Sequence, residues 1–398
     1  MNLPGIENIE WSAEDKVLMR VDFNVPLDSE GNVSDDTRIR SALPSIKYLT
    51  EKGCNLILCS HLGRPNGVPT EKFTLFPVAK RLQELLNEDV IFINKNTGPT
   101  ALNAVKNLTS GQVAVIENLR FNNGEKSNNP HFVKELAKLG TAYVNDAFGV
   151  LHRKHASVCG LAKSFDKKAV GFLIEKEHKA LNSLFESDKK PMTAILGGSK
   201  VSDKIILMEN LTHHASDIII GGAMAYTFLK AMGKPVGQSK VETSKLEIAE
   251  QLIEKAQMRD VTLHLPIDHV TTKYFSEDAE AEIHEEIPED QLGMDIGPKT
   301  IEAYAKVLSK AKSVFWNGPM GVFEWSHFSN GTKSIADELT QLEAYTVIGG
   351  GDSAAAVHKF GRADGIDHIS TGGGASLALL EGDILPGLAA FVKKGGRK

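Results

Sequence analysis

The C-terminal half of the chain contains a repeated pattern in which an apolar, β-branched run ends in small residues, usually glycines. The pattern occurs five times, in TAILGGSK, DIIIGGAM, SVFWNGPMG, YTVIGGGDS and HISTGGGAS. Near-continuous apolar runs are typical of parallel strands that are covered on both faces. Such sheets bind their ligands beyond the carboxyl ends of the strands. The glycines therefore predict a place where bare backbone approaches a bulky phosphorylated ligand.

The N-terminal half contains similar apolar runs, but these end in polar and cationic residues. They read MRVDFN, ILCSHLGR, AVIENLR and AYVNDAFGVLHR. Arginine binds phosphate and carboxylate groups through two parallel hydrogen bonds, so this half suits a small, highly charged anion. Two anion sites of different character on one chain indicate that a group is transferred between them.

Strand-like runs alternate with helix-like stretches nearly from end to end. The helical stretch Leu75–Asn87, for example, places Leu75, Val78 and Leu82 on one face. Repeated units of this kind predict the α/β class, and 398 residues are many for one core. We therefore expect two doubly wound (Rossmann-like) domains with parallel sheets, joined by a helix and hinge.

The boundary between the domains is predicted from a helical stretch, Ile174 to Glu186, and the polar run that leads from it to Pro191. The strongly acidic stretch Glu277–Asp290 is expected to be a solvated loop or hairpin rather than an interaction site. We expect four segments: an N-terminal domain at 1–173, an interdomain helix at 174–187, a C-terminal domain at 188–380, and a tail at 381–398 that packs back on the N-terminal domain.

The composition argues against several classes of protein. A net charge of -6 is unlike that of a general nucleic-acid or membrane-surface binder. No apolar run approaches the ~20 residues of a membrane span, and no secretory signal is visible. Cys54, Cys59 and Cys159 lack the spacing of a zinc or redox site, which suits reduced thiols. We expect a cytoplasmic protein without nucleic-acid or membrane partners.

Five arginines are scattered through the N-terminal half, four of them at or just past the end of a predicted strand: Arg20, Arg38, Arg64, Arg120 and Arg153. Because strand ends converge at one edge of a parallel sheet, these guanidinium groups are predicted to share one site. Three histidines accompany them, namely His61, His152 and His155. The alternative for any single arginine is a surface or ion-paired role, and a structural histidine is commoner than a catalytic one.

Asp22 and Asn24 follow the first of these strands and lie among the cations. Since a carboxylate repels phosphate, Asp22 is expected to contact a substrate hydroxyl or a neighbouring arginine. A small sugar-acid phosphate offers a hydroxyl and two anionic ends, and it matches this set of residues. No acidic residue is placed as a general base, and phosphoryl transfer to a carboxylate needs none.

Two lysines follow the first glycine pair of the C-terminal half. Lys200 ends the turn Gly197-Gly198-Ser199-Lys200, and Lys204 comes one helical turn later. We expect both ammonium groups to face one ligand from the start of a helix, where backbone N–H groups favour phosphate. The spacing is not that of a Walker A loop.

The turn Gly349–Ser353 also places glycines between a strand and a helix. Asp352 at this helix start either holds a Mg2+ ion bound to nucleotide phosphates or serves as an N-cap, and both alternatives stay open. The stretch Thr371–Ser376 supplies a further glycine cradle.

The segment Trp316–Glu324 is the most unusual in the chain. Its Met and Phe residues are candidates for an apolar wall against a base, with Glu324 accepting hydrogen bonds from ribose hydroxyls. The alternative is an ordinary strand end with core aromatics.

Taken together, these segments resemble the phosphoglycerate kinase family over almost the whole chain. RVDFNVP, SHLGRP, ENLRF, NDAFG with HRKHAS, GGSKVSDK, WNGPMGVFE, GGGDSAAA and STGGGASL occur in the family's order. The resemblance implies reversible, Mg2+-dependent phosphoryl transfer from 1,3-bisphosphoglycerate to ADP, giving 3-phosphoglycerate and ATP in glycolysis. It also implies a monomer that acts on small molecules only.

The resemblance implies three groups of site residues. Those for phosphoglycerate are Asp22, Asn24, Arg38, His61, Leu62, Gly63, Arg64, Arg120 and Arg153. Those for nucleotide are Lys204, Gly293, Glu324, Gly350, Gly351, Asp352 and Ser353, with Asp352 holding the metal. Those around the phosphoryl group in flight are Arg38, Lys200, Gly372 and Gly373. Direct in-line transfer is expected after a hinge closure that requires both ligands.

The chain departs from the family pattern at a few positions. Ser199 stands where alanine is common, Leu151 and Lys154 replace smaller residues, and Lys126 stands where an acidic residue is frequent. None of these positions carries a charge that the chemistry needs.

Two rival functions remain at this level. IGGGDSAA superficially fits the turn of a dinucleotide oxidoreductase, although no acidic residue ends the strand His368–Thr371 to grip a ribose. A binding module on the same scaffold is the other rival. Loss of Arg38, Lys200 or Asp352 would have favoured it, and all three are present.

Overall fold

The computed structural model describes residues 3–392, which form two compact units. The first unit contains the chain up to His178 and again from Ile384, and the second contains Lys179–Asp383. The change from one unit to the other falls inside α6 (Phe172–Ser183). This helix starts two residues before the predicted helical stretch and ends three residues before its predicted end, Glu186.

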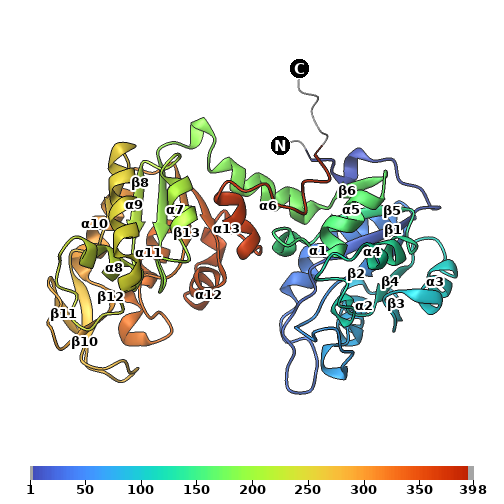
Figure 1. Cartoon of the computed structure of the whole chain (residues 1–398), viewed down its shortest axis with the longest axis horizontal. Helices are drawn as coiled ribbons and strands as arrows, with labels where there is room; N and C mark the ends of the chain where they lie inside the picture. The colour runs from blue at the N-terminus through green and yellow to red at the C-terminus, as the bar shows by residue number, and fades with distance from the viewer. Residues whose placement is uncertain (1–2, 393–398) are drawn as a thin grey trace. The chain divides into compact units, whose positions relative to one another are not determined.

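The first unit is built on a six-stranded sheet in the order β3-β4-β2-β1-β5-β6 (Figure 1), and every pairing in it is parallel. Its strands are β1 Lys16–Val21, β2 Asn55–Cys59, β3 Val90–Ile93, β4 Val113–Ile116, β5 Ala142–Asp146 and β6 Lys168–Val170. Before α6, the helices that alternate with them are α1 Thr37–Glu51, α2 Phe76–Leu86, α3 Gly98–Lys106, α4 Pro130–Ala137 and α5 Leu161–Ser164.

The second unit repeats this plan with a parallel sheet in the order β15-β14-β13-β7-β8-β9. Its strands are β7 Met192–Leu196, β8 Asp217–Ile220, β9 Thr262–His264, β13 Ser313–Asn317, β14 Tyr345–Ile348 and β15 His368–Ile369. Its helices are α7 Ile205–Leu211, α8 Met224–Ala231, α9 Leu246–Met258, α10 Pro298–Leu308, α11 Asn330–Leu339, α12 Gly351–Lys359 and α13 Gly374–Leu380. The prediction of two doubly wound domains with parallel sheets is confirmed.

A small antiparallel sheet in the second unit was not predicted. It has the order β11-β10-β12, with β10 at His269–Thr272, β11 at Glu282–His284 and β12 at Leu292–Ile296. Its short strands alternate too weakly to stand out, since Ile283 is exposed and Thr271 is buried. The acidic stretch contains β11, so the hairpin alternative for that stretch is the correct one.

Each unit has its own apolar core. In the first, β2 is buried along its whole length, and Leu75, Val78 and Leu82 of the predicted helical face are fully buried. In the second, Trp316 and Ile348 are fully buried at the centre of the sheet. Each such side chain contributes roughly 1.5–3 kcal/mol relative to exposure, so the cores hold the strand ends rigidly in place.

The segment after α13 returns to the first unit, where Leu385, Leu388 and Phe391 are buried. The ring of Phe391 stacks on Tyr143 with centroids 6.2 Å apart. The basic end of the predicted tail, 393–398, lies outside the described residues. Within residues 3–392, none of the helices combines the length and apolarity that a membrane crossing requires.

Candidate active site

Both parallel sheets reverse their strand order near the middle. In the first unit, β1 leads to β2 on one side while β5 leads to β6 on the other; in the second, β7 leads to β8 while β13 leads to β14. Ligands of such sheets bind beyond the carboxyl ends of the strands at this reversal. Most of the candidate residues follow strands at these edges, whereas Arg38 lies in α1 and Gly293 in β12.

Asp22 follows β1 and is nearly buried. Its Oδ2 accepts a hydrogen bond from Arg38 Nη1 at 3.0 Å, and its Oδ1 lies 3.9 Å from His61 Nδ1. Oδ1 is buried and has no hydrogen-bond partner among the described residues. Asp22 therefore has the neighbouring arginine that the sequence predicts, together with one oxygen still free to accept from a ligand.

The loop after β2 is held in place by hydrogen bonds on several sides. Asn24 Oδ1 accepts from the Gly63 amide at 2.9 Å, and Arg120 Nη1 donates to the Gly63 carbonyl at 2.7 Å. The Leu62 carbonyl accepts from Asn118 Nδ2 at 2.7 Å, and the Leu62 side chain is buried in the core. Leu62 and Gly63 thus shape the loop through their backbone.

Three of the predicted arginines line one pocket of about 290 Å³, which we call the anion pocket. Its lining residues are Arg64, Asn66, Arg120, Lys126, Arg153 and His155. Burial, together with Arg153 and Arg20, lowers the pKa of Arg120 to about 10, so that this guanidinium is still protonated at neutral pH. The sequence reasoning missed Asn66 and Lys126 as members of the pocket, although Lys126 already stood out as a departure from the family pattern.

Arg20 does not line the anion pocket, although its charge acts on Arg120 and Arg153. It is fully buried, and it hydrogen-bonds Ser157 Oγ at 2.8 Å and His61 Nδ1 at 3.1 Å. The prediction that it shares the ligand site is wrong, because its guanidinium group is held in buried contacts with Ser157 and His61 and does not line the pocket. Its contacts instead link the strand to residues around the pocket.

The histidines of this region are neutral at physiological pH. Burial, and then the surrounding arginines, hold the pKa of His61 well below its usual range. Burial and Arg120 lower the pKa of His155 to about 4, and burial also lowers the pKa of His152. These rings can therefore donate and accept hydrogen bonds, but they add no charge to the arginines.

In the second unit, the turns that follow β7 and β13 are in direct backbone contact, which their glycines make possible. The Gly198 amide donates to the Pro319 carbonyl at 2.9 Å. Gly318 has φ +99°, and a Cβ there would overlap the carbonyl oxygen of Gly197. Gly198, with φ +97°, has only open space where its Cβ would stand. The turns thus contain one glycine needed for packing beside another whose α-carbon faces open space.

The turn after β14 is held by hydrogen bonds to residues at the end of β13 and just beyond it. Ser353 Oγ accepts from the Gly318 amide at 2.6 Å, and Asn317 Nδ2 donates to the Gly349 carbonyl at 2.5 Å. Gly350 is the N-cap of α12, and Gly351 faces open space.

Asp352 lies exposed in the first turn of α12 and makes no capping hydrogen bond. The N-cap alternative for this residue is wrong, because Gly350 occupies the N-cap position.

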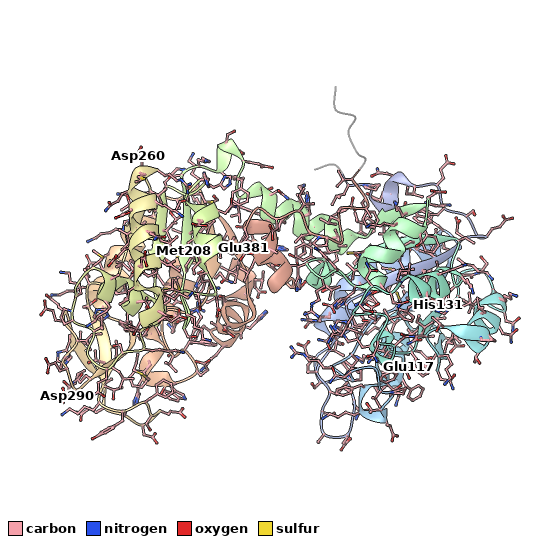
Figure 2. All side chains as sticks on the ribbon, in the orientation of Figure 1. Glu117, His131, Met208, Asp260, Asp290 and Glu381 are labelled. Atoms are coloured by element: carbon pink, nitrogen blue, oxygen red, sulfur yellow. The ribbon has the colours of Figure 1, made fainter. Side chains whose placement is uncertain are left out.

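The two lysines stand on a turn rather than on a helix. Lys200 is exposed, and α7 begins only at Ile205, so the predicted helix start at Lys200 is wrong. Lys204 is half-buried, and burial lowers its pKa, while Asp203, Asp352 and Glu381 act in the opposite direction. Glu381 follows α13 and is labelled in Figure 2. Lys204 and Asp352 therefore belong to one electrostatic group.

The remaining candidates of the second unit lie on three segments. Gly372 donates its amide to Ser370 Oγ at 3.1 Å, and Gly373 is the N-cap of α13. Gly293 lies in β12, donates to Ser239 Oγ at 2.9 Å, and has no room for a Cβ because of the Tyr226 hydroxyl.

Glu324 is exposed, whereas Trp316 and Met320 belong to the core. For these two apolar residues, the alternative of a strand end with core side chains is the correct one. The Trp316 indole also donates to the Gly318 carbonyl at 2.7 Å, which helps to fix the turn.

The donors in the second unit suit a metal ion that is shared with a ligand. Among the residues that the structure describes, no group of three or more His, Cys, Asp or Glu side chains could hold a metal ion by itself. Mg2+ prefers one or two carboxylates together with phosphate oxygens. The exposed carboxylate of Asp352, beside open glycine backbone, fits that donor set.

Comparisons with known proteins agree in naming one family. The family model for phosphoglycerate kinase matches residues 6–383. The chain is 48% identical to the phosphoglycerate kinase of Clostridium botulinum over 99% of both chains, and 49% identical to that of Anaeromyxobacter dehalogenans over 98% and 99%.

Solved structures give the same result. The phosphoglycerate kinase of Coxiella burnetii superposes with a TM-score of 0.91 at 39% identity, covering 98% of this chain and 99% of that one. The enzyme of Pyrococcus horikoshii gives 0.83 at 33% identity, with 98% of each chain covered. The chain therefore belongs to the phosphoglycerate kinase family.

Proposed function

We propose that the chain transfers the acyl phosphate of 1,3-bisphosphoglycerate to ADP, reversibly and with Mg2+, giving 3-phosphoglycerate and ATP. The observation that supports it best is the anion pocket, in which Arg64, Arg120 and Arg153 meet at one sheet edge. A second sheet edge in the same chain offers open glycine backbone with Lys204 and Asp352. A reaction between two phosphorylated ligands uses both.

The first unit is assigned to phosphoglycerate. The anion pocket would hold its phosphate through guanidinium groups, which bind phosphate in two parallel hydrogen bonds. The free Oδ1 of Asp22 can accept a hydrogen bond from the substrate hydroxyl, while Arg38 neutralises its other oxygen. Asn24, His61, Leu62 and Gly63 form the loop and wall that orient the molecule.

The second unit is assigned to the nucleotide. The turn Gly350–Ser353 and the ammonium of Lys204 would contact its phosphates, with Gly293 and Glu324 toward the base and ribose. Asp352 would hold Mg2+, which when bound neutralises charge on the phosphate oxygens.

The phosphoryl group would be surrounded during transfer by Arg38, Lys200 and the turn Gly372–Gly373. Phosphoryl transfer needs positioning and charge neutralisation rather than covalent chemistry. A single well-placed cation supplies roughly 10³–10⁵ in rate in comparable enzymes, and no side chain is needed as a nucleophile. Direct transfer after domain closure stays a prediction, which solution scattering of the complex with both ligands can test.

We further propose a cytoplasmic monomer of glycolysis that acts on small molecules and not on nucleic acid. Cys54, Cys59 and Cys159 are all unpaired and buried, and burial raises the pKa of Cys54 to about 11. Thiols of this kind are compatible with a reducing compartment.

The test is a coupled assay for ATP formation from ADP and enzymatically generated 1,3-bisphosphoglycerate, with and without Mg2+. We expect turnover that disappears when Mg2+ is chelated. The dinucleotide alternative is examined in parallel by thermal unfolding, where Mg-ADP is expected to raise the midpoint and NADPH is not. A protein that makes no ATP and is stabilised by NADPH would overturn the proposal.

A further inference from the structure

A buried carboxylate lies next to the anion pocket and has no part in the assignments above. Glu125 is fully buried, and its Oε1 and Oε2 accept hydrogen bonds from Ser157 Oγ at 2.6 Å and from the Ser157 amide at 3.0 Å. Oε1 also lies 3.8 Å from Nδ1 of His155, which lines the pocket. Because an uncompensated buried charge is strongly destabilising, the side chain needs a cationic partner.

Ser157 connects Glu125 to that partner. A hydroxyl has one hydrogen to donate and lone pairs to accept with, and the donated hydrogen goes to Glu125 because an ionised carboxylate only accepts. The Ser157 oxygen can then accept from Arg20 Nε, which lies 2.8 Å away. Arg20 is also fully buried. The two buried charges are thus joined through one hydroxyl.

Arg20 in turn fixes the protonation of His61. Its Nη2 lies 3.1 Å from His61 Nδ1, and a guanidinium group has no acceptor. Nδ1 must therefore accept, which leaves the single proton of the neutral ring on Nε2. The low pKa of His61, caused by burial and by the arginines, agrees with a neutral ring.

We propose that Glu125 is a positioning residue for the phosphoglycerate site: through Ser157 and Arg20 it holds His61 as a neutral ring with the proton on Nε2, ready to donate to the substrate. Only the identity of the substrate rests on the proposed function. A purely structural anchor for residues 155–157 is the competing explanation, since the Ala156 amide also donates to the Glu125 carbonyl.

The test measures the tautomer and the kinetics together. Ligand-free protein with 15N-labelled histidine is examined by long-range 1H–15N correlation, with His61 assigned from its loss in His61→Gln. Wild type is expected to show the Nε2–H tautomer between about pH 6 and 8. Glu125→Gln removes the charge while keeping the shape, and Ser157→Ala removes the hydroxyl bridge while keeping the carboxylate.

Both variants are expected to show His61 in a mixture of tautomers. The KM for 3-phosphoglycerate should rise about tenfold or more, as for loss of a hydrogen bond to a charged group, with the nucleotide KM unchanged. Asp15→Asn is the matched control, because this nearly buried carboxylate precedes β1 at the opposite sheet edge and pairs with Lys167 at 2.7 Å. It should leave both readouts at wild-type values.

The opposite results overturn the proposal. These are a wild-type His61 with its proton on Nδ1, or variants that lose only thermal stability while the tautomer and the KM stay as in wild type. If Glu125→Gln does not fold, Ser157→Ala decides by the same two measurements. The spectra need no ligand, so they test the connection from Glu125 to His61 by themselves. A wild-type protein that makes no ATP would count against the proposed function alone.

Discussion

The candidate phosphate sites of the two units are built from different kinds of groups. In the first, the candidate groups are charged and polar side chains: Arg120 and His61 are buried and Asp22 is nearly so, whereas Arg38 and Arg153 are partly buried and Arg64 is exposed. In the second, Lys200, Glu324 and Asp352 are exposed, and Gly198 and Gly351 have open space where a side chain would stand. The first unit presents a formed pocket, whereas the second presents a surface that its ligand and metal ion must complete.

This difference indicates which unit should make the stronger and more selective contacts with its ligand. Buried guanidinium groups act in a medium of low dielectric constant, so each contact with a substrate oxygen is strong and each misplaced atom is costly. Exposed charges are screened and adaptable. We expect substitutions in the first unit to be more damaging per charge than those in the second.

The largest effect is expected for Arg38→Ala, which removes the cation beside Asp22. The turnover number should fall about 10³-fold or more, while the affinity for nucleotide, measured by calorimetry, stays unchanged. Arg40→Ala is the control, since Arg40 lies on the same helix but is exposed and pairs with Asp36 at 2.8 Å. Wild-type turnover in Arg38→Ala would remove this residue from the transfer step.

A smaller effect is expected for Asp352→Ala in the second unit. Loss of the exposed carboxylate should weaken Mg-ADP binding by about 10- to 100-fold and leave phosphoglycerate binding intact. Calorimetric titration with and without Mg2+ measures the difference, and Asp364→Ala, an exposed carboxylate on another segment, provides the control. Equal Mg2+ dependence in variant and wild type would show that Asp352 holds no metal ion.

Lys126→Glu sharpens the comparison, because Lys126 is an exposed charge that lines the anion pocket together with the buried Arg120. We expect the KM for 3-phosphoglycerate to rise several-fold, to about tenfold at low salt, and the effect to shrink at high salt. Lys106→Glu, at the end of α3 near the amino end of β1, should have no effect. A change that is independent of salt would argue for a disturbed fold rather than a lost charge.

The smallest effect concerns Asp295, a buried carboxyl group that breaks the pattern of the second unit. Its oxygens accept from the Ile296 amide at 2.9 Å and the Gly331 amide at 2.6 Å, and burial raises its pKa from 3.8 to about 8. Between these values the folded state binds the extra proton, so the stability that this proton contributes is lost as pH rises toward 8.

Asp295→Asn cannot titrate, so its thermal unfolding midpoint should fall less steeply than that of wild type between about pH 5 and 8. Asp146 remains in the variant, and burial raises the pKa of this carboxyl to about 7, which leaves part of the slope. Asp364→Asn should follow the wild type. Parallel curves for Asp295→Asn and wild type would show that Asp295 is ionised throughout.

Much of the fold and part of the site could be predicted from the sequence, for a physical reason. Parallel strands buried on both faces leave near-continuous apolar runs, so β1, β2, β4 and β7 were visible together with the residues just beyond them. Arg20 was misplaced because the sequence does not show whether an arginine at a strand end reaches the ligand site or makes buried contacts, as Arg20 does with Ser157 and His61. Glu125 was missed because its partners, Ser157 and Arg20, are distant in sequence and become neighbours only in the folded unit.

The return of the chain to the first unit after Asp383 has a consequence for how the protein is made. The second unit is one continuous insertion, so a ribosome delivers all of it in sequence. The first unit begins earlier, yet Leu385, Leu388 and Phe391 complete its packing only after the whole second unit has been translated. Domains generally fold as units during synthesis, N-terminal ones first. Here the unit that begins to emerge first is completed after the second one, so the inserted unit can fold before the segment from Ile384 joins the first unit.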